Sequence, residues 1–388
     1  MHRSGSEQPP SHPDPHHLDP HHPHPPEATP AQRRRHRWVL LAGLLGTVLI
    51  GLLVAGQSRV NGELAPRFVP AAEPRVGWRG PADDGVASGI DAALLSFAIG
   101  WVLVVALTLL TPRGRRGTRS LRSSLRDGRL RWWMLLGGMG GASFIAGQGI
   151  AVPVLGVSVF TVATVAGLTI GGLLVDRFGL SPNGPRPYTT RRVVGCVVAV
   201  GGVALSVSGS LADGITSGAP VAVFVLVLVL CLPVGAGTAA QQAVNGRVAQ
   251  QSGTPWVAGL VNFTVGLAAL LLARLVLVGT VAPGPLPDLW WLYLSGPIGL
   301  SFIILGAALV RTLGGLLLSL GNTAGQLVGS ITIDELFPTD AGRPDVVQVV
   351  AAVVIFAAVA LAASSPRHAR GVPVPVAPVP VPLAPAAR

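Results

Sequence analysis

Charge, cysteine and lysine are all scarce in this chain, and each absence excludes a class of protein. Charged residues make up 12% of its 388 residues, about half the share found in a soluble domain. The two cysteines, Cys196 and Cys231, lie inside apolar stretches, so their spacing predicts neither a zinc site nor a disulfide framework. Histidine is absent between residues 38 and 364, and no Gly-x-x-x-x-Gly-Lys phosphate loop occurs. We therefore expect no enzyme, no ATPase, no bound metal in the apolar part and no cofactor.

Arginine alone carries the positive charge of the chain. The net charge is +11 at pH 7, and because lysine is absent all 28 basic residues are arginines. A nucleic-acid partner would require a basic patch interleaved with aromatic residues. These arginines instead lie mainly between apolar stretches. That distribution is typical of membrane topology, and we expect no nucleic-acid partner.

Long apolar stretches are the main feature that is present. Half of the residues are hydrophobic, and the mean hydropathy is +0.58. A helix that spans a bilayer needs roughly 20 apolar residues with few charges, and ten such stretches predict an all-α integral membrane protein with ten transmembrane helices. The predicted spans are residues 38–56, 90–111, 132–151, 154–175, 192–211, 219–239, 256–278, 289–309, 311–333 and 346–363.

The two ends of the chain differ from the rest in composition. Residues 1–37 are rich in proline and histidine and lack apolar periodicity, which predicts a disordered tail. Its six histidines from His12 to His24 could bind a metal weakly, or they could simply be part of a solvated tail. Residues 365–388 are rich in proline and valine, and we expect a second disordered tail there. Between the tails we expect two membrane repeats, residues 38–211 and 212–364.

The arginines also predict the orientation of the spans. Arginines from Arg33 to Arg37 precede the first span, and eight more from Arg113 to Arg131 lie between the second and third spans. Loops rich in arginine stay on the cytoplasmic side. The sequence therefore predicts a multi-pass protein of the cytoplasmic membrane, with the lipid bilayer as its partner and both termini in the cytoplasm.

An internal repeat divides the spans into two sets of five. Residues 57–62 read Gln-Ser-Arg-Val-Asn-Gly, and residues 241–246 read Gln-Gln-Ala-Val-Asn-Gly, an offset of 184. A second set of residues is repeated at an offset of 158. Leu155-Gly156, Ala166-Gly167, Gly171 and Asp176 match Leu313-Gly314, Ala324-Gly325, Gly329 and Asp334. Because five is odd, the second copy would enter the membrane upside down, which predicts inverted repeats with a site near the midplane. A chain with both halves is compatible with a functional monomer.

At these residues the chain resembles the YdcZ-like branch of the drug/metabolite transporter superfamily, as a tandem fusion of two five-helix units. The resemblance covers residues 38–364 and rests on the Gln-x-x-Val-Asn-Gly motif, on Ser/Asn-Phe-x-x-Gly at Ser96 and Asn262, and on an Ala-Gly…Gly…Asp helix. The family pattern Ala-Gly-Gln is kept at residues 324–326 and lost at 166–168, so we expect an asymmetric polar site. The resemblance implies an inner-membrane exporter and supplies no substrate.

Amides and hydroxyls within the spans are the candidate substrate-binding groups, because polar side chains in lipid usually face the bundle interior or a cavity. The candidates are Gln57, Asn61, Ser96, Thr164, Gln241, Asn245, Asn262, Asn322 and Gln326. Such groups could bind a neutral polar or weakly ionic small molecule, or they could bond across helices and only lock the bundle. Asn61-Gly62 and Asn245-Gly246 could also be ordinary helix ends.

Two carboxylates occupy equivalent positions at predicted membrane boundaries, Asp176 and Asp334. Each could bind a coupling ion, or each could be paired with a nearby arginine or solvated. Arg274 lies a few residues inside a predicted span and could extend its side chain to the interface. A role in a cavity is the alternative. No carboxylate is predicted at the middle of a span, which argues against the embedded-glutamate coupling of related small multidrug transporters.

The leading hypothesis is a secondary transporter that exports a small metabolite or drug-like molecule by alternating access. A non-transporting membrane scaffold or assembly protein is the first alternative, and a lipid-precursor flippase is the second. A transporter needs its amides to line a cavity that solvent can reach, whereas a scaffold would bury them in mutual pairs. A flippase would need a cavity open sideways to the bilayer.

Overall fold

The computed structural model describes residues 30–68, 81–180, 185, 188–208, 221–279, 284–338 and 342–363. Contacts divide the chain into a unit that ends at Leu41 and a larger unit that begins at Ala42. Within these ranges the chain forms helices and no β-strand. The elements are α1 (Pro30–Leu64), η1 (Ala65–Phe68), α2 (Pro81–Leu110), α3 (Pro112–Arg126), η2 (Trp132–Gly137), α4 (Gly138–Arg177), α5 (Thr190–Ser206), α7 (Val221–Ser252), α8 (Pro255–Leu277), η3 (Trp290–Leu294), α9 (Ser295–Leu336) and α10 (Val346–Ala363).

The distribution of apolar side chains is that of a membrane protein. Six of the described helical segments are long and apolar enough to cross a bilayer. On α8, Leu271, Leu275 and Val276 are 56–71% exposed, as expected of side chains that face lipid. Buried positions are rich in alanine, glycine and valine, which allow close helix packing. The prediction of an all-α membrane protein is therefore confirmed.

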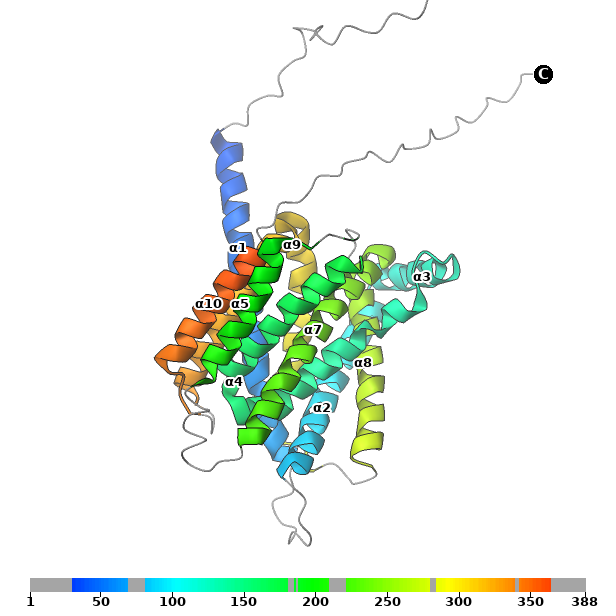
Figure 1. Cartoon of the computed structure of the whole chain (residues 1–388). Helices are drawn as coiled ribbons and strands as arrows, with labels where there is room; N and C mark the ends of the chain where they lie inside the picture. The colour runs from blue at the N-terminus through cyan, green and yellow to red at the C-terminus, as the bar shows by residue number, and fades with distance from the viewer. Residues whose placement is uncertain are drawn as a thin grey trace, which may run out of the picture. The chain divides into compact units, whose positions relative to one another are not determined.

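Two predicted spans lie within α4, which cannot be straight. Gly156 interrupts the helix with a φ of 78° and a ψ of 165°. On one side of it, Gly141 lies against the side chain of Gln241, and on the other, Gly167 lies against Leu232. A straight helix would separate these two glycines by about 39 Å, whereas Gln241 and Leu232 are only about 14 Å apart along α7. The chain thus reverses at Gly156, so that both arms of α4 pack on α7 (Figure 1).

The long helix α9 follows the same course against α1. Gly299 lies against the side chain of Gln57, and Gly325 lies against the backbone of Val48. The two glycines are 26 residues apart, which is again about 39 Å for a straight helix, whereas their contacts on α1 are about 14 Å apart. The helix must therefore reverse between Gly299 and Gly325. This agrees with the two predicted spans at 289–309 and 311–333.

Several element boundaries differ from the predictions. Helix α1 continues to Leu64 and α7 to Ser252, so the alternative that each Asn-Gly pair ends its helix is wrong. Residues 30–37, predicted as part of the tail, belong to α1. The predicted loop at residues 112–131 contains the helix α3. The predicted tails at 1–29 and 365–388, including the histidines from His12 to His24, lie outside the described residues.

The two halves use equivalent residues to contact each other. A Cβ added at Gly138 would clash with backbone atoms of Asn262, and one added at Gly296 would crowd those of Ser96. Likewise, Gly51 lies against the backbone of Asn322 and Gln326 on α9, and its equivalent Gly235 lies against that of Thr164 and Leu168 on α4. These pairs are related by the offsets of 184, 158 and 166 residues that align the two sequence halves.

At the centre of this arrangement lie Phe97 on α2 and its equivalent Phe263 on α8. Their ring centroids are 5.2 Å apart, with the rings tilted by 58°. Phe97 packs over Gly266, and Phe263 packs over Gly100. Each phenylalanine therefore packs on the glycine of the other half, and exchanging equivalent residues between the halves reproduces the same contacts. The offsets thus describe real spatial equivalence as well as sequence similarity.

These contacts predict that Gly167→Ala and Gly325→Ala each destabilise the protein. At both positions a Cβ would clash with a backbone carbonyl of the neighbouring helix, Leu232 or Val48, and overpacking costs about 1–3 kcal/mol. Gly172→Ala is the control, because a Cβ at Gly172 meets no atom within 4 Å. Thermal unfolding in detergent should give a lower midpoint for the first two variants only. An equal effect of all three would contradict the close approach.

Candidate functional site

Asn61 is the centre of a buried hydrogen-bond network in the first half. Its Oδ1 accepts bonds of 2.7 Å from the hydroxyls of Ser96 and Ser295, and its Nδ2 donates to Gln148 Oε1 at 2.6 Å. Gln148 Nε2 in turn donates to Ser58 Oγ at 2.8 Å. Asn61 and Gln148 are fully buried. We call these five residues the first amide network.

Gln57 extends this network across the two halves of the chain. Its Nε2 donates to the backbone carbonyl of Ser295 at 2.8 Å, while its Oε1 is buried without a hydrogen-bond partner. Segments of four helices therefore meet at this network, namely α1, α2, the first arm of α4 and the start of α9. In this conformation the predicted residues Gln57, Asn61 and Ser96 make the mutual contacts expected of groups that lock helices together.

Asn262 is the centre of a second, smaller network on α7 and α8. Its Oδ1 accepts from both Gln241 Nε2 at 2.7 Å and Asn245 Nδ2 at 3.0 Å. Gln241, Asn245 and Asn262 are the equivalents of Gln57, Asn61 and Ser96, and we call them the second amide network. Asn245 is only partly buried, unlike Asn61.

The two networks differ because the residues around them differ. Gln148 of the first half corresponds to Gly306 in the second, and a Cβ at Gly306 would meet no atom within 4 Å. Ser295 corresponds to Gly137, which lies beside Asn245 Oδ1. The second network therefore lacks the two side chains that cover the first one.

The remaining predicted amides lie where α1 packs on the second arm of α9. Gln326 is buried, and Asn322 Oδ1 is buried without a hydrogen-bond partner. Both contribute backbone atoms to the contact with Gly51. At the equivalent position on α4, the hydroxyl of Thr164 donates to the carbonyls of Phe160 and Thr161 in its own helix. The structure therefore does not bring Thr164, Asn322 and Gln326 into either amide network.

The two equivalent carboxylates have different partners. Asp176 forms an ion pair with Arg192, as expected of a boundary carboxylate. Asp334 is 3% exposed and accepts hydrogen bonds from the backbone N–H groups of Val157 and Ser158, at 3.1 and 2.6 Å. These are the first free N–H groups of the second arm of α4, where a carboxylate is stabilised by the helix dipole. Asp334 thus clasps the two halves together.

Sequence reasoning missed an ion pair between α2 and α8. Arg274 Nε donates to Asp91 Oδ1 at 2.6 Å, and the two side chains are only 12% and 8% exposed. Arg274 Nη1 also donates to the carbonyl of Gly279, just past the end of α8, at 3.2 Å. Its guanidinium therefore joins α2 to the end of α8. The pair joins residues 183 positions apart, so no local pattern could have shown it.

Gln148 is the second residue that was missed, although it is an amide inside a predicted span. The repeat comparison did not point to it because the equivalent position holds Gly306.

The position of Gln148 along α4 shows where the first amide network lies relative to the Asp91–Arg274 pair and the Asp334 contact. Gly149 and Ile150, beside Gln148, contact Gly89 on α2, two residues before Asp91. The first network, the Asp91–Arg274 pair and the Asp334 clasp therefore lie at the same end of the helices.

A family model described as "Putative inner membrane exporter, YdcZ" matches two segments of the chain, residues 83–205 and 226–361. The chain belongs to this family. Together the segments cover two thirds of the chain, one in each half, so the YdcZ-type unit occurs twice in tandem. Membership makes the chain a multi-pass transporter of the inner membrane, in the drug/metabolite transporter superfamily. No curated protein matches the chain.

The matched segments include most of both amide networks. Ser96 and Gln148 lie in the first segment, and Gln241, Asn245 and Asn262 lie in the second. Asn61 precedes the first matched segment, although its equivalent Asn245 is inside the second one. The matched segments thus include the centre of the second network, Asn262, and the equivalent Ser96 of the first network, but not Asn61.

The different surroundings of Asn61 and Asn245 predict unequal effects of the same substitution. Asn61→Leu would leave the hydroxyl of Ser295 and Oε1 of Gln148 without their partner, while Ser96 keeps its bond to the carbonyl of Ala92. Each buried unpaired group costs about 1–3 kcal/mol. Asn245→Leu removes one hydrogen bond at a partly buried position. Thermal unfolding should therefore give a midpoint at least several degrees lower for Asn61→Leu than for Asn245→Leu. Equal losses would contradict the assignment of Asn61 as a network centre.

Proposed function

We propose that the chain is a secondary transporter that exports a small, neutral or weakly ionic polar molecule by alternating access. Ten transmembrane helices would form two inverted five-helix repeats, with both termini in the cytoplasm. The reversals of α4 and α9 support this count, because each provides two passes. The arginines from Arg33 to Arg37 at the start of α1 and those of α3 support the orientation.

One observation carries this proposal: two buried hydrogen-bonded contacts and one largely buried ion pair join the two halves at one end. Ser295 bonds to Asn61, Arg274 pairs with Asp91, and Asp334 clasps Val157 and Ser158. In the proposed orientation this end faces away from the cytoplasm. At the opposite end the halves also meet at the buried backbone contact of Gly138 with Asn262, but hydrogen bonds such as those from Arg247 to the carbonyls of Gly179 and Leu180 are only partly buried. Such a difference is expected of a transporter that is closed on its outer side.

The second amide network is the proposed substrate site. It lies in the half of the membrane that faces the cytoplasm in this orientation, where an exporter collects its substrate. Gln241 and Asn245 both donate to one oxygen of Asn262, so a substrate that offers an acceptor can take over one of these donors. Hydrogen bonds of this kind suit hydroxyl, amide or zwitterionic groups better than a strongly charged ion.

A ligand screen tests the proposed site. A compound at 100 times its dissociation constant should stabilise the protein by about 2.7 kcal/mol. Asn245→Ala should lose this thermal shift, because it removes the donor that is partly exposed. Gln250→Ala is the control, since Gln250 is an exposed amide on the same helix. If a broad library of polar metabolites and drug-like compounds shifts no protein, or shifts both variants equally, the proposed site is wrong.

Crosslinking tests whether the outer side must open. In a Cys196→Ala/Cys231→Ala background, Asp334→Cys and Ser158→Cys would place thiols on both sides of the clasp. A short bis-methanethiosulfonate crosslinker, which forms a disulfide with each cysteine and releases methanesulfinate, should stop efflux of the screened compound from proteoliposomes. Reduction of these disulfides should restore efflux. The control pair is Val248→Cys/Ala258→Cys, which joins α7 and α8 inside the second half. Unchanged efflux after crosslinking of the clasp would exclude alternating access through this end.

A non-transporting scaffold is the second candidate, and the first amide network favours it. Asn61, Ser96 and Gln148 are buried in mutual hydrogen bonds, as interhelical locks would be. The two candidates differ at the second network, where Asn245 is partly exposed. A scaffold predicts that no compound binds there.

A further inference from the structure

Helix α3 is a short basic helix attached to the ends of α7 and α8. Thr111 caps its N-terminus by accepting a bond from Gly114 N at 3.1 Å, and Pro112 occupies the first turn. Its buried face consists of Gly114, Gly117, Leu121 and Ser124. Gly117 lies so close to Thr254 that a Cβ there would clash with the threonine methyl group.

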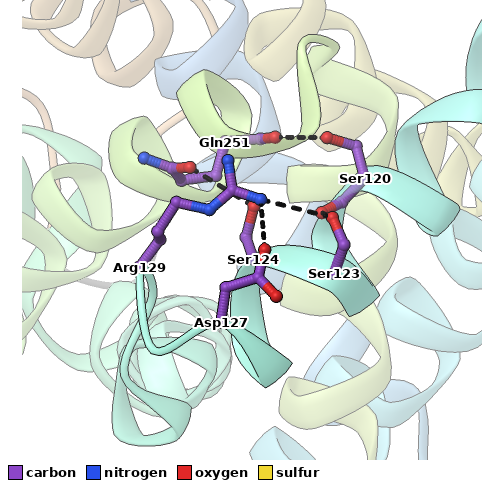
Figure 2. Close-up of polar contacts among 6 residues, drawn as sticks. All are labelled: Ser120, Ser123, Ser124, Asp127, Arg129 and Gln251. Carbon is purple, nitrogen blue, oxygen red and sulfur yellow. Dashed lines mark hydrogen bonds and ion pairs between the residues drawn. The ribbon is translucent and has the colours of Figure 1, made fainter.

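Hydrogen bonds fix this helix to the last turn of α7. Ser120 Oγ donates to the carbonyl of Gln251 at 2.8 Å, and Ser124 Oγ donates to Gln251 Oε1 at 3.3 Å (Figure 2). After the helix, Asp127 accepts a bond from Arg129 at 2.6 Å, on the side of α3 that carries Ser123 (Figure 2). The helix is therefore held in one rotational position, which decides where its remaining side chains lie.

Four arginines form a stripe on the face of α3 opposite the buried one. Their spacing is i, i+4, i+7 and i+11, which places them on one side of a helix, and they are Arg115, Arg119, Arg122 and Arg126. All eight arginines of residues 113–131 are exposed. Asp127 is the one acidic residue of this segment, and it is already bonded to Arg129.

The flanking residues place α3 at the level of the lipid headgroups. Leu110, which ends α2, is 78% exposed, and Trp132, which begins η2, is 71% exposed. An exposed leucine at the end of an apolar helix faces acyl chains, and exposed tryptophans gather at the membrane interface. Arg115 Nη1 also donates to the carbonyl of Leu109 at 2.8 Å, so the stripe begins next to the lipid-facing end of α2.

The fold itself does not need this helix. In the second half, α8 and η3 are joined by residues 278–289, which contain no basic residue and one acid, Asp288. The equivalent helices nevertheless pack in the same way, as the pairs Gly138–Asn262 and Gly296–Ser96 demonstrate. The arginine stripe is thus an addition to one half, and its function lies outside helix packing.

We propose that α3 binds the headgroups of anionic phospholipids in the cytoplasmic leaflet. A helix with one docked face and one arginine face at the interface matches the geometry of surface-bound basic helices. Guanidinium groups donate two parallel hydrogen bonds to a phosphate, and the surface potential of an anionic leaflet attracts clustered arginines within a Debye length. Lipid binding here would fix the depth of α2, α7 and α8 in the membrane. This inference rests on the membrane location of the chain and on its proposed orientation, and not on the proposed substrate site.

The test compares two double variants of the full-length protein in a nonionic detergent. Arg119→Gln/Arg122→Gln removes two charges from the stripe, and Arg67→Gln/Arg343→Gln removes two exposed charges elsewhere. The midpoint of thermal unfolding is measured while phosphatidylglycerol or phosphatidylcholine is added. We expect phosphatidylglycerol to raise the midpoints of the wild type and the control equally, and the stripe variant to lose at least half of that rise.

Further arms separate lipid binding from other causes. Arg119→Lys/Arg122→Lys keeps both charges, so it should keep most of the rise in the midpoint if charge at the interface is what binds the lipid. This variant also replaces the glutamine variant in the comparison if the latter folds poorly. Free glycerol phosphate at equal concentration should cause no shift. An equal rise in all variants would overturn the proposal. A rise with phosphatidylcholine or glycerol phosphate as large as with phosphatidylglycerol would also overturn it, in favour of nonspecific lipid stabilisation or of a free-anion site.

Discussion

Close approach of helix backbones at small residues is the constraint on which the rest of this structure depends. In a bilayer the hydrophobic effect does not drive helices together, so association relies on packing and hydrogen bonds. Here Gly51 lies against the backbone of α9, and its equivalent Gly235 lies against that of α4. In the same way, Gly138 lies against the backbone of α8, and Gly296 lies against that of α2. Because these contacts occur in equivalent pairs, one packing solution is used twice. The same contacts bring the amides of α1 and α7 within hydrogen-bond distance of their partners.

On this shared backbone, side-chain differences make the two halves unequal. Gln148 and Ser295 add partners to the first amide network, whereas Gly306 and Gly137 leave the second one smaller. Asp91 and Arg274 correspond to Val257 and Thr108, so the ion pair also has no counterpart among these equivalent residues. Two identical halves would give two conformations of equal free energy. In the proposed alternating-access cycle, the unequal residues would favour one of them through the polar contacts that only one end makes.

Much of this fold could be predicted from the sequence, because its main signals are local or periodic. Apolar length predicts membrane-spanning helices, of which six described segments are long and apolar enough to cross a bilayer. Constant offsets relate Asn61 to Asn245. The turn at Gly156 separates two predicted spans, although both belong to a single assigned helix. Helix α3 was predicted as a loop because its arginines were interpreted as topology signals. Thr111-Pro112 and the i, i+4, i+7 spacing of arginines were the overlooked helix signals.

The candidate site was harder to predict, because its polar partners are distant in sequence. The repeat comparison selects residues that are alike in both halves, and it therefore passes over the ones that make the halves differ, such as Gln148 and Asp91. Those residues need three-dimensional contacts to be recognised, since Asn61 meets Gln148 across 87 positions and Asp91 meets Arg274 across 183. A sequence search of a duplicated transporter should accordingly look for polar residues in apolar spans whose repeat equivalents are glycine, valine or threonine. Residues that are alike in both halves then indicate how the halves pack, and residues that differ indicate where the polar contacts between the halves are unequal.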